Sequence, residues 1–450
     1  MPEPYDVITM GRIGVDLYPL QTGVPLSRVE TFGKFLGGSP SNVAVAAARL
    51  GRRTAVITRT GQDPFGDYLH QALAEFGVDD RWVSAVADLP TPVTFCEIFP
   101  PDNFPLYFYR RPQAPDLEIH AEEVDLDAVR DARVFWMTGT GLCAEPSFSA
   151  TLTALRARGA AANEALQAPD TSGGRRRITV FDLDWRPMFW DGGDHSSVAP
   201  ARYREALAHA TVAVGNLDEC EIATGEREPH KAARALLAAG VELAVVKQGP
   251  AGVLAAHRDG TTAEIPPLPV DVVNGLGAGD AFGGALCHGL LAGWGTERVM
   301  RYANAAGAIV ASRLACSSAM PFPHEVEQAL AVGKVEQALA EGRVGPGAAP
   351  GPVGAPEPAS TPGPTSATDP ASTPQPTSAT DPAGAGGPTR TTGPASTAGP
   401  TSAPGPAGAG GPARTTGPAS TAGPTSAPGP ANAGGPASAA GPTSATGAAP

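Results

Sequence analysis

The sequence predicts an α/β protein built in three layers, α/β/α, with a mainly parallel central sheet, a small β lid and a disordered C-terminal tail. Three observations lead to this prediction. Short apolar runs alternate with stretches of helical period along the first 344 of the 450 residues, which is typical of a parallel sheet covered by helices on both faces. Two segments break this rhythm, and the final 106 residues have a different composition.

The expected strands and helices of the body follow one another along the chain. Each apolar run has a length suited to a strand, and apolar residues recur at helical spacing between the runs. We expect strands in 7–17, 54–61, 133–139, 179–185, 212–216 and 242–249, and helices in 41–51, 65–78, 147–160 and 324–342.

The lid is expected in the two segments that break the rhythm, residues 12–36 and 91–110. Both alternate apolar and polar residues around Pro and Gly turns, which indicates antiparallel strands outside the central sheet. A small sheet inserted there can cover a substrate cleft. Because exposed strand edges often pair between subunits, we expect a homodimer through the lid. The body with its lid forms one domain, residues 1–344.

The tail, residues 345–450, contains 21 Gly and 24 Pro but no aromatic residue and no Leu, Ile or Met. A segment with so little to bury is expected to be disordered. It repeats itself with periods of 12 and 24 residues, but these repeats lack the apolar face that stacked repeats share. The tail is therefore a spacer or docking segment, or expanded low-complexity sequence without a role, and composition favours the second interpretation.

Charge and cysteine usage limit the partners. The formal net charge of −13 argues against nucleic acid, because binding to phosphate backbones needs a basic face. The five cysteines form no CxxC pair, which favours reduced thiols and a cytoplasmic location over disulfides or a zinc site. Glu3 and Asp6 lie where a secretory signal carries positive charge, and no apolar run approaches the ~20 residues that span a bilayer. The sequence therefore predicts no membrane partner.

The stretch NGLGAGDAFGG at 274–284 carries the clearest chemistry. Gly277, Ala278 and Gly279 are small enough for a phosphoryl group to approach the backbone, and the helix that follows adds the positive end of its dipole. Asp280, in the first turn, would be a base that activates a hydroxyl nucleophile. The alternative is an ordinary helix start with an acidic first turn, which the local spacing taken alone favours.

Two further motifs shift the balance toward phosphoryl chemistry. Gly249 and Gly252 form a turn between two apolar strands, and such a turn can lie flat under a nucleotide base. Asn216 ends a strand and Glu219 follows three residues later. This pair either holds Mg²⁺ through water beside phosphate oxygens or forms only a capping box.

In this order the motifs resemble those of the ribokinase, or PfkB, family of carbohydrate kinases, over about residues 5–330. In that family the GAGD motif supplies the anion hole and the catalytic base, NxxE organises Mg²⁺ and phosphates, and GxxG lies near the nucleotide. Asn274 stands where the family usually has Asp, next to the place of a monovalent cation. The resemblance implies a ribokinase-like fold and the cofactors ATP and Mg²⁺, with a monovalent cation as a further candidate.

The resemblance also assigns the remaining site residues. Asp16, Gly38 and Asn42 would hold the sugar, although Asp16 could cap a turn and Asn42 a helix start. Around the nucleotide the implied residues are Asn216, Glu219, Lys247, Gly249, Gly252 and Asn304.

Several stretches, among them FYRRPQAPDL at 108–117 and FDLDWRPMFW at 181–190, are most similar to family members that phosphorylate a keto sugar acid. A carboxylate needs a cation, and the Arg fork matches two oxygens at once. Arg110 is the first candidate and Arg186 the second, although Arg186 could face the triphosphate instead and both could make surface ion pairs.

The predicted reaction is ATP-dependent phosphorylation of the terminal hydroxyl of a sugar acid, with Asp280 as the base. Closure of the lid would exclude water from the reacting groups. The alternatives are a kinase of the same family for another sugar acid or for fructose, and a sensor that binds a sugar or nucleotide without catalysis.

Overall fold

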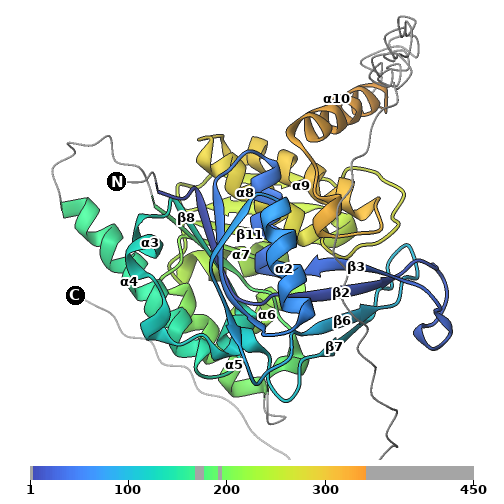
Figure 1. Cartoon of the computed structure of the whole chain (residues 1–450). Helices are drawn as coiled ribbons and strands as arrows, with labels where there is room; N and C mark the ends of the chain where they lie inside the picture. Colours follow the sequence, from blue (N-terminus) through green and yellow to red (C-terminus); the bar gives the residue numbers. More distant parts are fainter. Residues whose placement is uncertain (1–3, 168–176, 191–194, 341–450) are drawn as a thin grey trace, which may run out of the picture. The chain divides into compact units, whose positions relative to one another are not determined.

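The computed structural model describes residues 4–167, 177–190 and 195–340, and its centre is a nine-stranded sheet of order β13-β12-β11-β10-β9-β8-β1-β4-β5 (Figure 1). All pairings from β5 to β11 are parallel, whereas β12 pairs antiparallel with β11 and β13. The strands are β1 Val7–Met10, β4 Thr54–Gly61, β5 Val78–Val86, β8 Val134–Thr138, β9 Ile178–Asp182, β10 Val212–Asn216, β11 Leu243–Lys247, β12 Val253–His257 and β13 Thr262–Ile265.

Helices cover both faces of this sheet (Figure 1). One layer consists of α1 Ser39–Arg49, α2 Pro64–Glu75, α8 Ala278–Leu291, α9 Thr296–Ala311 and α10 Pro323–Ala340. The other consists of α3 Leu126–Asp131, α4 Ser147–Gln167, α5 His195–Leu207, α6 Leu217–Thr224 and α7 Pro229–Ala238. Short 3₁₀ turns lie at Leu26–Arg28, Pro115–Glu118, Ala121–Glu123, Gly139–Leu142, Pro187–Phe189, Gly249–Ala251 and Ser317–Ala319.

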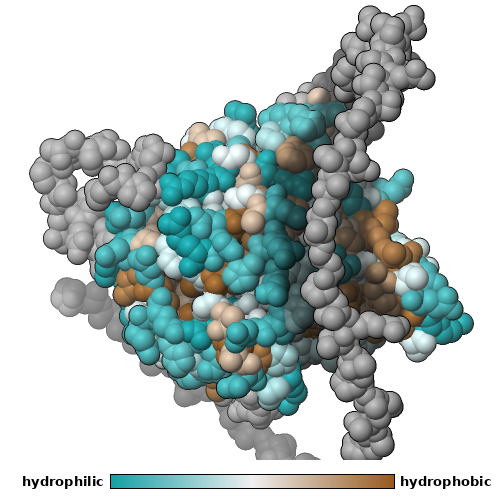
Figure 2. All heavy atoms as spheres, in the orientation of Figure 1, coloured by the Kyte–Doolittle hydropathy of each residue, from teal (hydrophilic) through white to brown (hydrophobic). Residues whose placement is uncertain are grey.

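Two hydrophobic cores form because successive strand residues point to opposite faces. Val134 and Trp136 of β8 belong to the core under α1 and α8, while Phe135 and Met137 belong to the core under α4 and α5. Figure 2 shows mainly hydrophilic residues over the helices that face the viewer, as expected when a helix buries only its apolar side. The predicted three-layer fold is confirmed.

The lid is a four-stranded sheet of order β3-β2-β6-β7 that extends from the body on the right of Figure 1. Its strands are β2 Gly14–Pro19, β3 Phe32–Gly37, β6 Val93–Cys96 and β7 Leu106–Tyr109. The expected antiparallel pairing holds for β2-β3 and β6-β7, but β2 and β6 pair in parallel. The prediction of purely antiparallel strands was wrong because the chain returns to the central sheet between β3 and β6, and such a crossover allows parallel pairing.

The apolar run predicted as one strand at 7–17 is divided between the two sheets. β1 lies in the central sheet and β2 in the lid, and Gly11, Arg12 and Ile13 connect them. Gly11 adopts a φ of 141°, and a Cβ there would lie 2.9 Å from the Pro40 ring. These three residues are therefore one of the connections between body and lid.

The prediction for residues 345–450 lies outside the residues that the structure describes. Within the described ranges, no helix combines the length and the apolar character needed to cross a membrane.

Candidate active site

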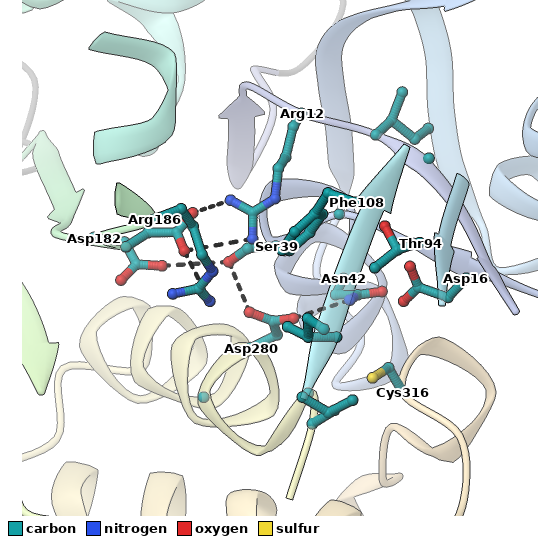
Figure 3. Close-up of a pocket in the computed structure, with 18 of the residues that line it drawn as sticks. Arg12, Asp16, Ser39, Asn42, Thr94, Phe108, Asp182, Arg186, Asp280 and Cys316 are labelled. Atoms are coloured by element: carbon teal, nitrogen blue, oxygen red, sulfur yellow. Dashed lines mark hydrogen bonds and ion pairs between the residues drawn. The ribbon is translucent and has the colours of Figure 1, made fainter. Parts of the chain in front are cut away.

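A polar cavity of about 290 Å³ lies where the carboxyl ends of the central strands meet the lid. Asp182, Asn216 and Lys247, the last residues of β9, β10 and β11, line it from the body, and Phe108 of β7 lines it from the lid. Figure 3 shows Asp182 and Phe108 in this wall. This edge is where ligands bind in open parallel sheets. The polar cavity brings together these predicted residues: Asp16, Gly38, Asn42, Arg110, Arg186, Asn216, Glu219, Lys247, Gly277, Gly279 and Asp280.

A more apolar cavity of about 550 Å³ adjoins it, and Lys247, Gly275 and Gly279 line both. The remaining predicted residues line this apolar cavity: Gly249, Gly252, Ala278 and Asn304.

The predicted glycine turn forms one wall of the apolar cavity. Gly252 adopts a φ of 93°, and a Cβ on it would lie 2.1 Å from the Ile265 carbonyl oxygen. On the other side, Asn304 of α9 donates from Nδ2 to the Pro266 carbonyl oxygen at 2.7 Å. The turn therefore requires Gly at this position, since any side chain would collide with β13.

Asp280 lies in the first turn of α8, whose N-cap Gly277 has a left-handed φ of 81°. Its Oδ1 accepts a hydrogen bond from the Ser39 hydroxyl at 2.7 Å, and its Oδ2 accepts one from Asn42 Nδ2 at 2.9 Å (Figure 3). Burial raises the pKa of Asp280, although the Ser39 and Asn42 hydrogen bonds oppose this. The carboxylate is thus fixed in direction and is a stronger base than an exposed Asp.

Asp16 of the lid strand β2 and Asn42 of α1 both line the polar cavity, and neither caps a helix. Asp16 sits within β2 and accepts from the Tyr18 hydroxyl at 2.9 Å. Burial raises its pKa to about 7, against the opposing effects of Tyr18 and Arg12. Asn42 lies inside α1, whose N-cap is Gly38, and its buried Oδ1 has no partner among the described residues. That orphaned acceptor suits a hydroxyl donor from a ligand.

Asn216 and Glu219 form the capping box that the sequence left as an alternative. Asn216 Oδ1 accepts from the Glu219 amide at 2.9 Å, and Glu219 Oε2 accepts from the Asn216 amide at 2.7 Å. The second carboxylate oxygen of Glu219, Oε1, faces Arg186 Nη1 at 3.8 Å. The structure therefore confirms the cap and leaves Oε1 directed to the cavity.

Lys247 stands at the junction of the two cavities. Burial opposes its charge, but Glu219, Asp182 and Asp280 together raise its pKa. Lys247 therefore carries a positive charge at the boundary of the two cavities.

Arg110 and Arg186 do not make surface ion pairs, so that alternative was wrong. Arg110 donates from Nη2 to Asp116 at 2.7 Å, and the two side chains are only 10% and 3% exposed. Arg186 Nη2 lies 3.1 Å from Asp184 Oδ1, and its own side chain is 29% exposed. Both cations belong to the cavity wall.

Asn274, which replaces the Asp usual in the family, is fully buried. Its Nδ2 donates to the Leu314 carbonyl oxygen at 2.7 Å, and its Oδ1 accepts from the Leu276 amide at 3.1 Å. The side chain thus anchors the loop before α8, and the monovalent cation stays a prediction.

Sequence analysis missed Arg12, Ser39, Asp182, Asp184 and Cys316, all of which line the polar cavity. Their partners lie far away in sequence. The hydrogen bond between Ser39 and Asp280 joins residues 241 positions apart, and that between Arg12 and Asp184 joins residues 172 apart. Arg12 lay inside the strand expected at 7–17, and the division of that run into β1 and β2 is what places Arg12 at the end of a strand.

Known proteins are similar to this chain in sequence and in fold. The family model described as "pfkB family carbohydrate kinase" matches residues 5–323 of this chain. A 5-dehydro-2-deoxygluconokinase of Clostridium tetani is 30% identical over 332 residues, covering 72% of this chain and 93% of the relative. One of Geobacillus kaustophilus is 30% identical over 333 residues, covering 72% and 93%.

Two solved structures are similar as well. A fructokinase with bound ATP from Xylella fastidiosa has a TM-score of 0.61 at 25% identity, covering 74% of this chain and 99% of its own. A putative ribokinase II from E. coli, in complex with ATP and Mg²⁺, has a TM-score of 0.63 at 24% identity, covering 73% and 99%.

A lidded α/β/α fold with an acidic side chain held at a helix N-terminus is the arrangement of a sugar kinase, and the chain belongs to the pfkB family of carbohydrate kinases. Its residues are consequently arranged to transfer a phosphoryl group to a sugar hydroxyl.

Proposed function

We propose that this kinase uses ATP to phosphorylate 5-dehydro-2-deoxy-D-gluconate at its C6 hydroxyl, giving 6-phospho-5-dehydro-2-deoxy-D-gluconate and ADP, as a step of myo-inositol catabolism in the cytoplasm. The observation that carries the proposal is Asp280, held by Ser39 and Asn42 beside the junction of the two cavities. The names of the relatives at 30% identity support the substrate. Five buried, unpaired cysteines support a reducing compartment.

The mechanism follows from the geometry around Asp280. The C6 hydroxyl would lie against the free side of its carboxylate, with Asp16 and Asn42 holding other oxygens of the sugar. As the sugar oxygen bonds to the γ-phosphorus, the bond from that phosphorus to the ADP oxygen breaks and the hydroxyl proton moves to Asp280. The amides of Gly277 to Gly279 and the Lys247 ammonium stabilise the negative charge on the transferring group.

The carboxylate of Glu219 in the cavity wall is a suitable ligand for Mg²⁺. The Oε1 of this carboxylate is directed to the cavity while Oε2 is engaged in the cap, so Glu219 could hold the ion through water. Asn216 would contribute through the same cap, because its Oδ1 already accepts from the Glu219 amide. Bound there, Mg²⁺ would neutralise charge on the phosphates.

The sugar carboxylate would bind Arg110. This guanidinium is fixed by Asp116 and by the Phe189 ring, whose centroid lies 4.8 Å away, and it lines the polar cavity next to the lid. A planar cation held in one orientation suits a planar carboxylate. This arrangement favours a sugar acid over a neutral hexose.

A panel of acceptors in an ADP-release assay tests the proposal. We expect the highest kcat/KM with 5-dehydro-2-deoxy-D-gluconate, lower values with 2-keto-3-deoxygluconate, and the lowest with fructose. Arg110→Met should raise KM for the acids by ~10-fold or more, the loss of a charge-assisted hydrogen bond, and leave KM for fructose unchanged. The neighbouring Arg111→Met is the matched control, since Arg111 is exposed and does not line the polar cavity. Preference for fructose over both acids would refute the substrate.

We also propose a homodimer through the lid. β7 is the edge strand of the lid sheet, and it exposes Tyr107 and Tyr109 by 41% and 64%. An edge with exposed aromatic residues favours pairing with a second copy. Light scattering during size-exclusion chromatography should give twice the chain mass, and Tyr109→Lys should give the single mass. A wild-type protein that elutes as a monomer at all concentrations would rule the dimer out.

A further inference from the structure

A row of alternating charges crosses the polar cavity from the lid connection to the capping box. Arg12, in the connection between β1 and β2, pairs with Asp184 through Nη1 and lies 3.4 Å from Asp184 Oδ1 through Nη2. Asp184 in turn pairs with Arg186 at 3.1 Å, and Arg186 faces Glu219 at 3.8 Å. The last contact is the longest of the row. Arg186 is held by Asp184 and by the Trp185 carbonyl oxygen, to which its Nη1 donates at 2.8 Å.

Asp184 is held in place by its burial, its backbone conformation and hydrogen bonds, in addition to its ion pairs. It is 3% exposed and has a φ of 31°, which a residue with a side chain rarely adopts. Tyr203 donates to the carbonyl oxygen of the preceding Leu183 at 2.6 Å, and Thr140 donates to Asp184 Oδ2 at 3.2 Å. Strained backbone persists where surrounding contacts over-determine it, and it concentrates at functional sites.

Burial raises the pKa of Asp184, but Arg12 and Arg186 outweigh burial and lower it below its ordinary value. Burial likewise opposes the charge on Arg12, and Asp184 outweighs it. Both partners therefore stay ionised without water around them. Two guanidinium groups share the one carboxylate of Asp184, so this carboxylate alone does not neutralise both.

Arg186 lies on the side of the polar cavity that Glu219 lines, 3.8 Å from this carboxylate. Its neighbour Glu219 is the largest contributor among the carboxylates that raise the pKa of Lys247, and Lys247 lines both cavities. Arg110, in contrast, is bound to Asp116 and Phe189 next to the lid. Figure 3 shows Arg12, Arg186 and Asp182 together on one side of Asp280, and Asp16, Thr94 and Asn42 on the other.

We propose that Arg12 and Asp184 form a positioning pair that holds Arg186 toward the transferring phosphoryl group, and that Arg186 contacts this group rather than the sugar carboxylate. The inference rests on the proposed kinase reaction but not on which sugar is the acceptor. Within this row of charges Arg186 is accordingly a catalytic residue beside Asp280, because it touches the reacting group. Arg12 and Asp184 act through it.

The test is a double-mutant cycle read out by nucleotide binding and by turnover. Calorimetry would give the Kd of ADP and of the non-hydrolysable analogue AMP-PNP, each with Mg²⁺. Arg186→Met should weaken AMP-PNP by ~10-fold or more, the loss of a charge-assisted hydrogen bond, and change the Kd of ADP by less than ~2-fold. Arg12→Met should show the same selectivity for AMP-PNP. In the Arg186→Met background, Arg12→Met should then add almost nothing, since both changes remove one interaction.

Turnover gives a second readout. Arg186→Met should lower kcat by ~10²-fold, as the loss of a group that stabilises transition-state charge does, with little change in KM for the acceptor. Arg12→Lys should restore part of the kcat lost in Arg12→Met, because it keeps a cation beside Asp184. Arg133→Met is the matched control: Arg133 pairs with Asp6 at 2.8 Å and does not line the polar cavity, so its kcat should remain at the wild-type value.

Three results would contradict the role proposed for Arg12, Asp184 and Arg186. Additive losses from Arg12→Met and Arg186→Met, or equal weakening of AMP-PNP and ADP, would overturn the positioning pair while leaving the kinase function intact. A rise in KM for the sugar acid alone would place Arg186 at the carboxylate and also overturn it. If the wild-type protein bound neither nucleotide, the inference and the proposed function would both be wrong.

Discussion

The buried carboxylate of Asp16 should make the stability of the folded protein depend on pH in an unusual direction. Burial raises its pKa from 3.8 to about 7, although Tyr18 and Arg12 oppose the rise. Between these two values the folded chain keeps a proton that the unfolded chain has lost. The contribution of Asp16 to the free energy of unfolding therefore falls as pH rises through this window and levels off above about pH 7. At ~1.4 kcal/mol for each pKa unit, ionised Asp16 destabilises the fold by roughly 4 kcal/mol at alkaline pH.

Asp16→Asn removes this charge while keeping the shape of the side chain. Urea unfolding of the ligand-free protein, followed by Trp fluorescence between pH 4 and 8.5, should show the variant more stable than wild type by up to ~4 kcal/mol at pH 8.5 and nearly equal to it at pH 4. The same variant should bind the sugar more weakly, because Asn accepts less strongly from a hydroxyl than a carboxylate does.

Asp63→Asn is the control with the opposite sign. Asp63 caps α2, and although burial raises its pKa, hydrogen bonds from Thr91, Gly66 and Phe65 lower it below the ordinary value. This variant should be less stable than wild type by the same amount from pH 5 to 8.5. A stability difference between wild type and Asp16→Asn that is identical at pH 5 and pH 8.5 would refute the burial argument.

Three further predictions follow from the site and the tail. Asp280→Asn should lower kcat by ~10³-fold or more, the contribution of a general base, while calorimetry still detects ATP binding; near-normal turnover would show that another group is the base. Gly252→Ala should raise KM for ATP and leave KM for the sugar unchanged in steady-state assays, because its Cβ would collide with the Ile265 carbonyl oxygen; equal changes in both KM values would contradict the placement of the nucleotide. Truncation after Val344 should leave kcat, both KM values and the melting temperature unchanged, and any loss would assign the tail a role.

The parts of the molecule that depend on local sequence were predictable. The apolar runs predicted β1, β4, β8, β9, β10 and β11 in their order along the chain, but not β5 or β13. The GAGD motif placed Asp280 in the first turn of a helix, as the structure has it. The capping box at Asn216 and the glycine turn at Gly252 were also readable, because each depends on residues within a few positions of one another.

The row of alternating charges in the polar cavity was not predictable, because it joins residues from elements that are distant in sequence. Arg12 lay inside one expected strand, and only the fold brings it beside Asp184, two residues after the end of β9. Asn42 looked like a cap until α1 began at Ser39 and directed its amide to Asp280. The parallel pairing of β2 with β6 likewise depends on a crossover through the central sheet, which alternation of residue types does not encode.

The polar and apolar cavities share Lys247, Gly275 and Gly279 as common lining. A single synthetic compound could therefore occupy both, with a sugar acid at one end, adenosine at the other and a short polyphosphate between them. Tethering of this kind raises affinity by ~10²–10⁴-fold over either half alone. Such a compound would hold the lid over the body and would offer a route to crystals of the closed enzyme.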